Sequence, residues 1–442
     1  MRVDRIGEDT VLAQIVRLVS QAQRSRAPIQ GIADKVASWF VPAVIVIAVI
    51  TSLAWFYLGP EPRLAYAIVN AVAGLIIACP CALGLATPMS IMVGIGRGAH
   101  AGVLVRNAAA LERVEKVTHV IVDKTGTLTV GRPEVTAVSV IDGYTDARVL
   151  AVAAALERQS EHPLAHAVVT AATNRGLETP GADDFESMTG SGVTARVDGR
   201  LTRVGKRSWL KSMGVNVSSE LDTAAHRLLE TGATVIWVAI ETDAVGVLAL
   251  ADPVKASTKS AVGDLHAWGL KVIMLTGDHQ ATAEAIARQL DIDEVHAQLT
   301  PEDKHRIVAE LKADGAVVAM AGDGINDAPA LAAADVGIAM GTGTDVAIES
   351  ADITLVKGDL RGIASALLLS RATMRNIRQN LFFAFIYNAA GVPLAAGLLY
   401  PILGWLLNPM FAGAAMALSS VSVITNALRL NRADLGSARD TA

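Results

Sequence analysis

The sequence predicts a multi-domain membrane protein, with α-helical transmembrane segments and an α/β domain that carries an inserted α+β domain. Three observations indicate this fold class: long stretches without charge, apolar runs that alternate with helical stretches, and a break in that alternation over residues 132–248. Only 18 % of the 442 residues are charged, against about a quarter in soluble domains. The low charge favours membrane segments, and the length suits several domains.

Three stretches of the chain contain no charged side chain, namely 39–60, 64–96 and 381–428. A helix needs about 20 apolar residues to cross the hydrocarbon core, and the last stretch is long enough for two crossings. Buried helices of a large soluble protein are the alternative, which the length of the runs disfavours. We therefore predict four transmembrane helices, at 39–58, 65–88, 380–399 and 409–428.

Arginines flank the predicted helices at one set of ends. The connections 59–63 and 400–408 carry little or no net charge, whereas the opposite ends carry Arg97, Arg106, Arg371, Arg375, Arg378, Arg429 and Arg432. Positively charged ends stay in the cytoplasm, which places segment 97–378 there. The net charge of −5 gives no indication of nucleic-acid binding.

Short apolar runs alternate with helical stretches between residues 117 and 356. The runs are apolar on both faces and rich in β-branched side chains, as buried parallel strands are. We expect strands at 117–122, 271–275, 316–320, 336–340 and 353–356, and helices at 257–268, 281–289 and 304–312. This order predicts a doubly wound parallel sheet, in which ligands bind beyond the carboxyl ends of the strands.

Residues 132–248 interrupt this alternation and predict an inserted domain with an antiparallel sheet. Turn residues such as Asp198-Gly199 separate its apolar runs. The expected elements are a helix at 147–158 and strands at 193–197, 202–204, 234–240 and 244–250.

Polar clusters follow three of the predicted parallel strands directly. They are Asp123-Lys124-Thr125-Gly126-Thr127, Thr276-Gly277-Asp278 and the run from Gly322 to Asp327. One such cluster alone is usually a turn. Three clusters at the carboxyl ends of strands in one sheet are expected to converge on a site.

The residue types in these clusters suit phosphoryl transfer. The carboxylate of Asp123 can attack a phosphoryl group and form an aspartyl-phosphate. Asp323 and Asp327 can hold Mg²⁺ against it. Lys304 and the Thr276 hydroxyl can neutralise and hydrogen-bond the phosphoryl oxygens.

The run from Asp123 to Thr129 resembles the phosphorylation motif of the P-type ATPases, and the other two clusters are similar to further motifs of that family in the same order. The resemblance covers nearly the whole chain and implies a haloacid-dehalogenase-like phosphorylation domain in which Asp123 is phosphorylated. It implies Mg²⁺ ligation by Asp123, Asp323 and the Thr125 carbonyl, with Asp327 as a further ligand. The predicted catalytic residues are Asp123, Lys124, Thr125, Thr276, Gly277, Asp278 and Lys304.

The insert resembles the nucleotide-binding domain of the heavy-metal subgroup. Ser160-Glu161-His162-Pro163 is similar to the adenine-site motif of that subgroup, and Gly190-Ser191-Gly192 is similar to its glycine loop. Lys206 departs from the asparagine that is common after the following glycine. The resemblance implies ATP as cofactor, bound by Glu157, His162, Pro163, Gly190, Gly192 and Gly205.

The only two cysteines flank Pro80 inside the second predicted membrane helix. Proline removes a backbone hydrogen bond and unwinds the helix locally, so that non-helical backbone is expected there. A structural disulfide between neighbours this close in sequence is not expected. Two small buried cysteines beside a kink are the alternative, but thiolates at such a break suit a soft metal ion such as Cu(I) or Zn(II).

The other predicted spans favour Cu(I). Met is a soft ligand, and no Asp, Glu, Lys or His lies anywhere in the four predicted spans. The combination resembles the Cu(I)/Ag(I) branch rather than the Zn(II)/Cd(II)/Pb(II) branch of the family. The predicted ion ligands are Cys79, Cys81, Tyr387, Asn388, Met416 and Ser419.

The resemblance implies an ATP-driven exporter of Cu(I) or Ag(I) in the cytoplasmic membrane, with its catalytic domains in the cytoplasm. Its implied partners are ATP, the ion, membrane lipid and a cytoplasmic copper chaperone, without nucleic acid.

No Thr-Gly-Glu loop of an actuator domain is found, and residues 3–10 resemble the end of that domain, so a truncated catalytic half is expected. The domains expected are 1–38, end of the actuator domain and linker; 39–96, first helix pair; 97–131 with 249–360, phosphorylation domain; 132–248, nucleotide-binding domain; 361–379, linker helix; 380–430, second helix pair; and 431–442, tail.

Three alternatives stay open from the sequence. The first is a Zn(II)/Cd(II) pump of the same family, and the second is an inactive truncated product. The third is a phosphatase of the haloacid-dehalogenase type, which shares the sheet and the nucleophile. Such phosphatases usually carry a second acid two residues after the nucleophile, where this chain has Thr125.

Overall fold

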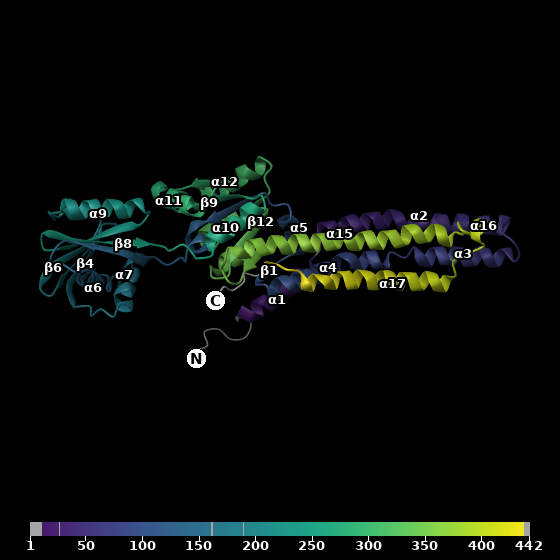
Figure 1. The fold of residues 1–442 in the computed structure, drawn as a ribbon, viewed down its shortest axis with the longest axis horizontal. Coiled ribbons are helices and arrows are strands. Elements are labelled where there is room, and N and C mark those ends of the chain that lie inside the picture. The colour runs from purple at the N-terminus through teal and green to yellow at the C-terminus, as the bar shows by residue number, and fades with distance from the viewer. Residues whose placement is uncertain (1–10, 26, 161, 189, 437–442) are drawn as a thin grey trace. The chain divides into compact units, whose positions relative to one another are not determined.

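A computed structural model describes residues 11–25, 27–160, 162–188 and 190–436 (Figure 1). It divides into two compact units, the first with residues up to 118, 334–341 and from 348, the second with 119–333 and 342–347. The predicted end of an actuator domain, over residues 3–10, lies outside the described residues.

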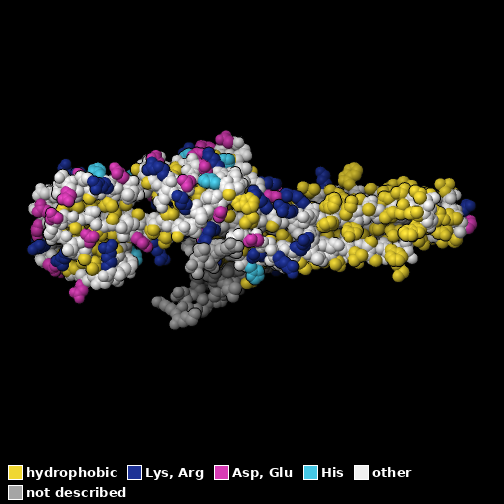
Figure 2. All heavy atoms as spheres, in the orientation of Figure 1, with side chains coloured by type: hydrophobic (Ala, Val, Ile, Leu, Met, Phe, Trp, Pro, Cys, Tyr) yellow, Lys and Arg dark blue, Asp and Glu magenta, His cyan; other side chains and the backbone are white. Residues whose placement is uncertain are grey.

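The first unit is mainly a bundle of long helices that lie side by side (Figure 1). Large hydrophobic side chains are exposed along these helices, and Figure 2 shows them covering the surface of the bundle. Exposed apolar surface of this extent is typical of a lipid-facing protein. The main helices are α1 (Val11–Arg24), α2 (Pro28–Leu58), α3 (Arg63–Ile77), α4 (Cys81–His100), α15 (Arg361–Ala395) and α17 (Pro409–Leu428).

Among the described residues, three stretches are long and apolar enough to cross a membrane: Val16–Leu58, Arg63–His100 and Pro409–Arg432. They contain the predicted spans 39–58, 65–88 and 409–428. The predicted span 380–399 falls mostly on α15, which is not among the three. Polar residues at 378–380, Asn388 and Pro393 interrupt the apolar character of that helix. The count of four spans therefore stays a prediction.

The helix that carries the cysteines is interrupted as predicted. Helix α3 ends at Ile77 and α4 begins at Cys81, because Pro80 cannot donate the backbone hydrogen bond that would join them. The structure joins Cys79 and Cys81 as a disulfide, which the sequence analysis did not expect. The break brings their Cα atoms to 5.4 Å, within the usual range for such a bond.

The first unit also contains three short strands, β1 (Val103–Val105), β12 (Val336–Met340) and β13 (Ile353–Leu355). Strand β13 pairs parallel with β12 and antiparallel with β1. Short elements complete the unit: α5 (Ala108–Val114), α16 (Tyr400–Leu403) and the 3-10 turn Arg429–Arg432. Helix α14 (Asp345–Ser350) contributes its last residues.

In the second unit, four parallel strands lie in the order β11-β2-β9-β10. They are β2 (His119–Asp123), β9 (Lys271–Leu275), β10 (Glu294–His296) and β11 (Val318–Gly322). The helices of this part are α10 (Thr258–Ala267), α11 (Gln280–Leu290), α12 (Pro301–Ala313) and α13 (Ala328–Ala333). The predicted strands are confirmed within two residues, and the short β10 was missed.

The insert is a six-stranded antiparallel sheet in the order β3-β8-β7-β6-β5-β4. Helices α6 (Asp146–Glu157), α7 (Pro163–Asn174), α8 (Arg207–Ser212) and α9 (Ser219–Glu230) accompany it, and α6 and α7 share a buried core with the sheet. The four predicted strands are confirmed, whereas the first and last of the sheet were missed. Its strands are β3 (Glu134–Val140), β4 (Ala182–Met188), β5 (Gly192–Val197), β6 (Arg200–Gly205), β7 (Thr234–Ile240) and β8 (Asp243–Ala251).

Candidate active site

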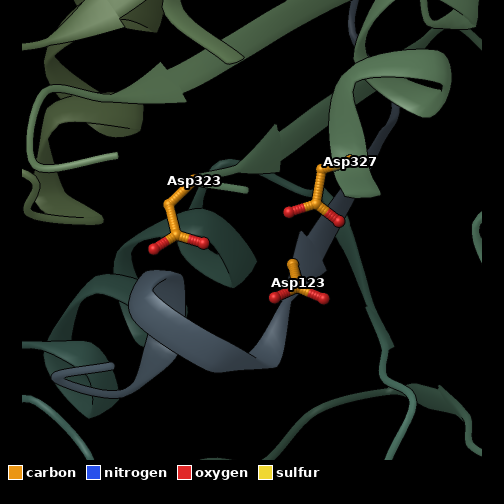
Figure 3. A group of neighbouring side chains, drawn as sticks. All are labelled: Asp123, Asp323 and Asp327. Carbon is orange, nitrogen blue, oxygen red and sulfur yellow. The ribbon is translucent and has the colours of Figure 1, made fainter. Parts of the chain in front are cut away.

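The three polar clusters meet at the carboxyl ends of β2, β9 and β11, as predicted. Asp123 is the last residue of β2, and Asp323 and Asp327 lie in the loop after β11. One carboxylate oxygen from each lies within 4.8 Å of the others, and Figure 3 shows the three side chains as neighbours. Parallel strands in one register bring these residues together although about 200 positions separate them.

Lys304 supplies the positive charge between these carboxylates. Its Nζ donates to Asp123 Oδ1 at 2.6 Å and to Asp327 Oδ1 at 2.7 Å, and all three side chains are buried. The lysine lies in the first turn of α12, which a capping box of Thr300 and Asp303 holds in place. Two buried anions and one cation leave a net negative charge that suits a divalent cation.

Burial raises the pKa of Asp123 from 3.8 to about 7, and the charge on Asp327 adds to the rise, while Lys304 opposes it. Burial and Asp327 also raise the pKa of Asp323. Burial alone would lower the pKa of Lys304, but the two carboxylates outweigh it and raise that pKa. Without a metal ion, the cluster therefore holds protons more tightly than free carboxylates do.

The loop after β2 owes its shape to Gly126, whose φ is +71°. A Cβ at this position would lie 1.6 Å from Asp323 Oδ2, so only glycine lets the loop pass beneath that carboxylate. Gly322 is equally restricted, since its Cβ would lie 2.7 Å from the Cβ of Asp327. Both glycines therefore keep the acidic cluster compact.

The remaining predicted catalytic residues line the same edge of the sheet. Lys124 pairs with Asp278 at 2.5 Å, and the buried Thr276 hydroxyl accepts a hydrogen bond from the Asp278 backbone at 3.1 Å. Gly277, between them, has open space except for the Leu299 carbonyl at 3.5 Å. The side chain of Thr125 is exposed.

Two residues that the sequence analysis missed brace this loop. Asp252 accepts hydrogen bonds from the Thr129 hydroxyl at 2.5 Å and from the Gly131 backbone at 2.9 Å. The ammonium of Lys255 donates to the carbonyls of Gly126 and Thr127. The signal available was their position, because Asp252 to Lys255 directly follow the strand that returns from the insert.

The carboxylate cluster fits Mg²⁺, which favours oxygen ligands and uses few carboxylates from the protein. Among the described residues, Lys304 pairs with Asp123 and Asp327 but not with Asp323, whose carboxylate lies near the other two (Figure 3). Bound Mg²⁺ would favour the ionised form of Asp123 and so offset the effect of burial.

The raised pKa of Asp123 predicts a pH-dependent stability in the absence of Mg²⁺. The folded chain binds the Asp123 proton more tightly than the unfolded chain does. This proton therefore stabilises the folded chain below about pH 4, and the stabilisation is lost as the pH rises to about 7. Asp123→Asn should therefore unfold at a higher temperature than the unchanged chain at pH 8. The difference should shrink by about 1 kcal/mol between pH 7 and pH 6.

Thermal denaturation with a chelator at pH 6, 7 and 8 measures this difference. Asp264→Asn, an exposed carboxylate on α10, is the matched control and should show no comparable trend. A difference between Asp123→Asn and the unchanged chain that grows toward pH 6 would contradict the prediction.

A cavity of about 520 Å³ in the insert contains most of the predicted nucleotide-binding residues. This volume suits a small-molecule cofactor. Burial raises the pKa of Glu157 at its wall, and a hydrogen bond with Ser160 opposes the rise. Five predicted residues line the cavity, Glu157, His162, Gly190, Gly192 and Gly205, and so does Lys206.

His162 and the glycines have specific roles in this cavity. His162 caps α7, since its Nδ1 accepts a hydrogen bond from the Leu164 backbone at 3.2 Å. A Cβ at Gly192 would lie 2.4 Å from the Val204 carbonyl, and one at Gly205 would lie 2.7 Å from the Cα of Gly192. Pro163 begins α7, but its side chain and Glu161 lie outside the described residues.

The predicted ion ligands lie in the bundle of the first unit. Cys79 packs against a buried cluster that contains Met416. Asn388 and Ser419 are buried, and Asn388 Oδ1 and Ser419 Oγ have no hydrogen-bond partner among the described residues. Unsatisfied polar atoms in an apolar interior are costly, and an ion that accepts oxygen ligands would satisfy them.

Two of the predicted ion ligands are placed differently. Cys81 is exposed, and Tyr387 is 39 % exposed, so the described bundle does not enclose either side chain. Cys81 is the first residue of α4 and is not a member of the buried cluster around Met416. The described structure thus groups Cys79 with Met416 but does not gather all six predicted ligands.

Comparison with known proteins identifies the chain's relatives. Residues 117–335 match the family of haloacid dehalogenase-like hydrolases. The chain is 58 % identical to a copper-exporting P-type ATPase of Legionella pneumophila, over 98 % of this chain and 59 % of that protein. It is 56 % identical to a silver exporting P-type ATPase of Salmonella typhimurium, over 99 % of this chain and 53 % of that protein.

A solved structure of a zinc-transporting PIB-type ATPase is also similar, with a TM-score of 0.80 and 36 % identity over 97 % of this chain and 68 % of that chain. The present chain spans between about half and three fifths of the length of the copper and silver relatives. The similarity therefore covers the described units throughout.

Proposed function

The chain belongs to the heavy-metal branch of the P-type ATPases, and from this membership we propose that it forms the ATP-consuming and ion-conducting part of a Cu(I) or Ag(I) exporter. The observation that carries the proposal is the buried cluster of Asp123, Asp323, Asp327 and Lys304 at the strand ends. The relatives at 56–58 % identity export copper or silver, whereas the zinc-transporting structure is 36 % identical.

The phosphorylation step follows from the positions of these side chains. Asp123 is the nucleophile: its carboxylate oxygen attacks the γ-phosphorus of ATP, the bond to the bridging oxygen breaks, and ADP leaves. Lys304 favours the ionised form of Asp123 and neutralises the phosphoryl oxygens. Asp323 and Asp327 would hold Mg²⁺, which supplies further charge neutralisation.

Lys124, Thr276 and Asp278 shape the surroundings of the phosphoryl group. The pair of Lys124 with Asp278 fixes the lysine at the edge of the site, and the Thr276 hydroxyl retains its own hydrogen to donate. Thr125 stands where related phosphatases carry a second acid, so no carboxylate at that position activates water. This supports a long-lived aspartyl-phosphate, which a pump requires.

For ATP we propose the cavity of the insert, with His162 stacked on or hydrogen-bonded to adenine. The glycines at 190, 192 and 205 let the backbone approach the nucleotide. Lys206 at the same wall adds a positive charge in place of the common asparagine. It would suit a phosphate group.

For the ion we propose a site around the break at Pro80, with Cys79 and Met416 as soft ligands. Ion binding requires the two cysteines as thiolates, so the site forms only in the reduced chain. The polar oxygens of Asn388 and Ser419 complete the proposed set, and Tyr387 and Cys81 would have to turn inward. The chaperone partner and the cytoplasmic membrane remain proposals that rest on the family.

Phosphorylation by γ-labelled ATP in the presence of Cu(I), Ag(I) or Zn(II) tests the ion. We expect acid-stable label with Cu(I) or Ag(I) and little with Zn(II), under reducing conditions. Label that requires Zn(II) would keep the pump and overturn the proposed ion. Label that is independent of every metal would favour the phosphatase-type alternative.

A further inference from the structure

A pocket of about 440 Å³ lies beside α15, outside the sites described so far. Its wall combines arginines with aromatic side chains. The residues that line it are Glu115, Arg371, Arg375, Arg378, Gln379, Phe382 and Phe383. All of them belong to the first unit.

The helix arranges these residues in one stripe. Arg371, Arg375, Arg378 and Phe382 are spaced by 4, 3 and 4 positions, which keeps them on the same face of an α-helix. The stripe is basic at one end and aromatic at the other. Phe382 is 62 % exposed and Phe383 is 39 % exposed, although both are large apolar side chains.

An ion pair holds one arginine of the basic end in place. Arg378 makes a two-pronged ion pair with Glu115, with Nη1 and Nη2 at 2.9 and 2.7 Å from the two carboxylate oxygens. The lining contains three arginines and one acid, Glu115, so the lining side chains carry a net positive charge. Arg375 is exposed beside that pair.

The surface of the bundle changes from charged to hydrophobic side chains along its length. Lys and Arg side chains gather where the hydrophobic surface of the bundle begins (Figure 2). Beyond Phe383 the exposed side of α15 continues with Ile386, which is 46 % exposed. Arginines followed along one helix face by exposed aromatic and aliphatic side chains are typical of a helix that passes from phosphate headgroups into acyl chains.

We propose that this pocket binds the headgroup phosphate of an anionic phospholipid, with Arg371 and Arg375 contacting the phosphate and Phe382 and Phe383 lying along the acyl chains. Arginine matches a phosphate group in two-pronged geometry, and basic pockets at the membrane surface bind anionic headgroups. A free phosphate would satisfy the arginines but would leave the two phenylalanines exposed. The inference goes beyond the ATP and ion sites and depends on neither.

The test uses the whole chain in lipid nanodiscs that mix phosphatidylcholine with phosphatidylglycerol. Lipids that stay bound after transfer to detergent are counted by mass spectrometry. The unchanged chain should retain phosphatidylglycerol at least about 3-fold above its share of the nanodisc, which corresponds to about 0.65 kcal/mol. Arg371→Gln with Arg375→Gln should lose this enrichment, while Arg378 and its pair with Glu115 stay intact.

Arg175→Gln with Arg227→Gln is the matched control, because it removes the same charge from exposed positions in the insert. It should retain the enrichment, and both variants should bind ATP as the unchanged chain does. Equal retention of phosphatidylglycerol by the variant of the pocket, or no enrichment in the unchanged chain, would overturn the proposal. So would displacement of the lipid by inorganic phosphate at millimolar concentration, since this would indicate a site for the free ion.

Discussion

A chain with serine at positions 79 and 81 is expected to bind Cu(I) more than about 100-fold more weakly than the unchanged chain. Changes to groups that only orient a metal ligand already cost about 10–100-fold in affinity, and this change removes two proposed ligands. Serine offers a hard hydroxyl in place of a soft thiolate, so it cannot replace the contact with Cu(I). The effect should be large because Met416 alone would remain as a soft ligand.

Competition with a chromogenic Cu(I) chelator under reducing conditions measures the affinity. Met92→Leu is a suitable control, since Met92 lies on the same helix as Cys81 but is 41 % exposed and no proposed ligand. The control should bind like the unchanged chain. Retained affinity in the double serine variant would show that the ion site lies elsewhere.

Replacement of Lys304 by methionine is expected to slow phosphorylation by about 100–1000-fold, the usual cost of losing one donor that stabilises transition-state charge. The variant removes the ammonium that contacts Asp123 and Asp327. Because Lys304 lowers the pKa of Asp123, its loss should also leave more of the nucleophile protonated. The residual rate should therefore depend more steeply on pH than the rate of the unchanged chain.

The rate of label incorporation from γ-labelled ATP, followed between pH 6 and pH 8, measures both effects. Lys259→Met, which removes an exposed lysine from α10, should leave the rate unchanged. A normal rate with Lys304→Met would mean that this lysine does not neutralise the phosphoryl group.

The acidic cluster proposed for phosphorylation was predictable from the sequence because its residues directly follow the ends of buried strands. Each buried strand is recognisable as an apolar run, and the polar residue that follows it must lie at the carboxyl edge of the sheet. Asp123, Thr276 and Asp323 were therefore assigned to one place correctly. The residues proposed to bind nucleotide could be named only from the family resemblance, since the position of His162 or of a single glycine is not restricted in this way.

Three features of the structure could not be predicted from the pattern of apolar and polar residues. Strand β4 is polar and largely exposed, so that it lacks the alternation that marks a half-buried strand. Asp252 and Lys255 act through backbone groups of the loop after β2, and such contacts leave no periodic pattern. The exposure of the Cys81 and Tyr387 side chains depends on how the helices of the bundle pack together. The spacing of residues within one helix does not determine that packing.

The account depends on Asp123 as the residue that receives the phosphoryl group from ATP, and one comparison tests this directly. The unchanged chain and Asp123→Asn are incubated with γ-labelled ATP, Mg²⁺ and Cu(I) and then precipitated with acid. The account predicts label that hydroxylamine removes in the unchanged chain and no label in the variant. Equal label in Asp123→Asn, or label that resists hydroxylamine, would contradict an aspartyl-phosphate at this position.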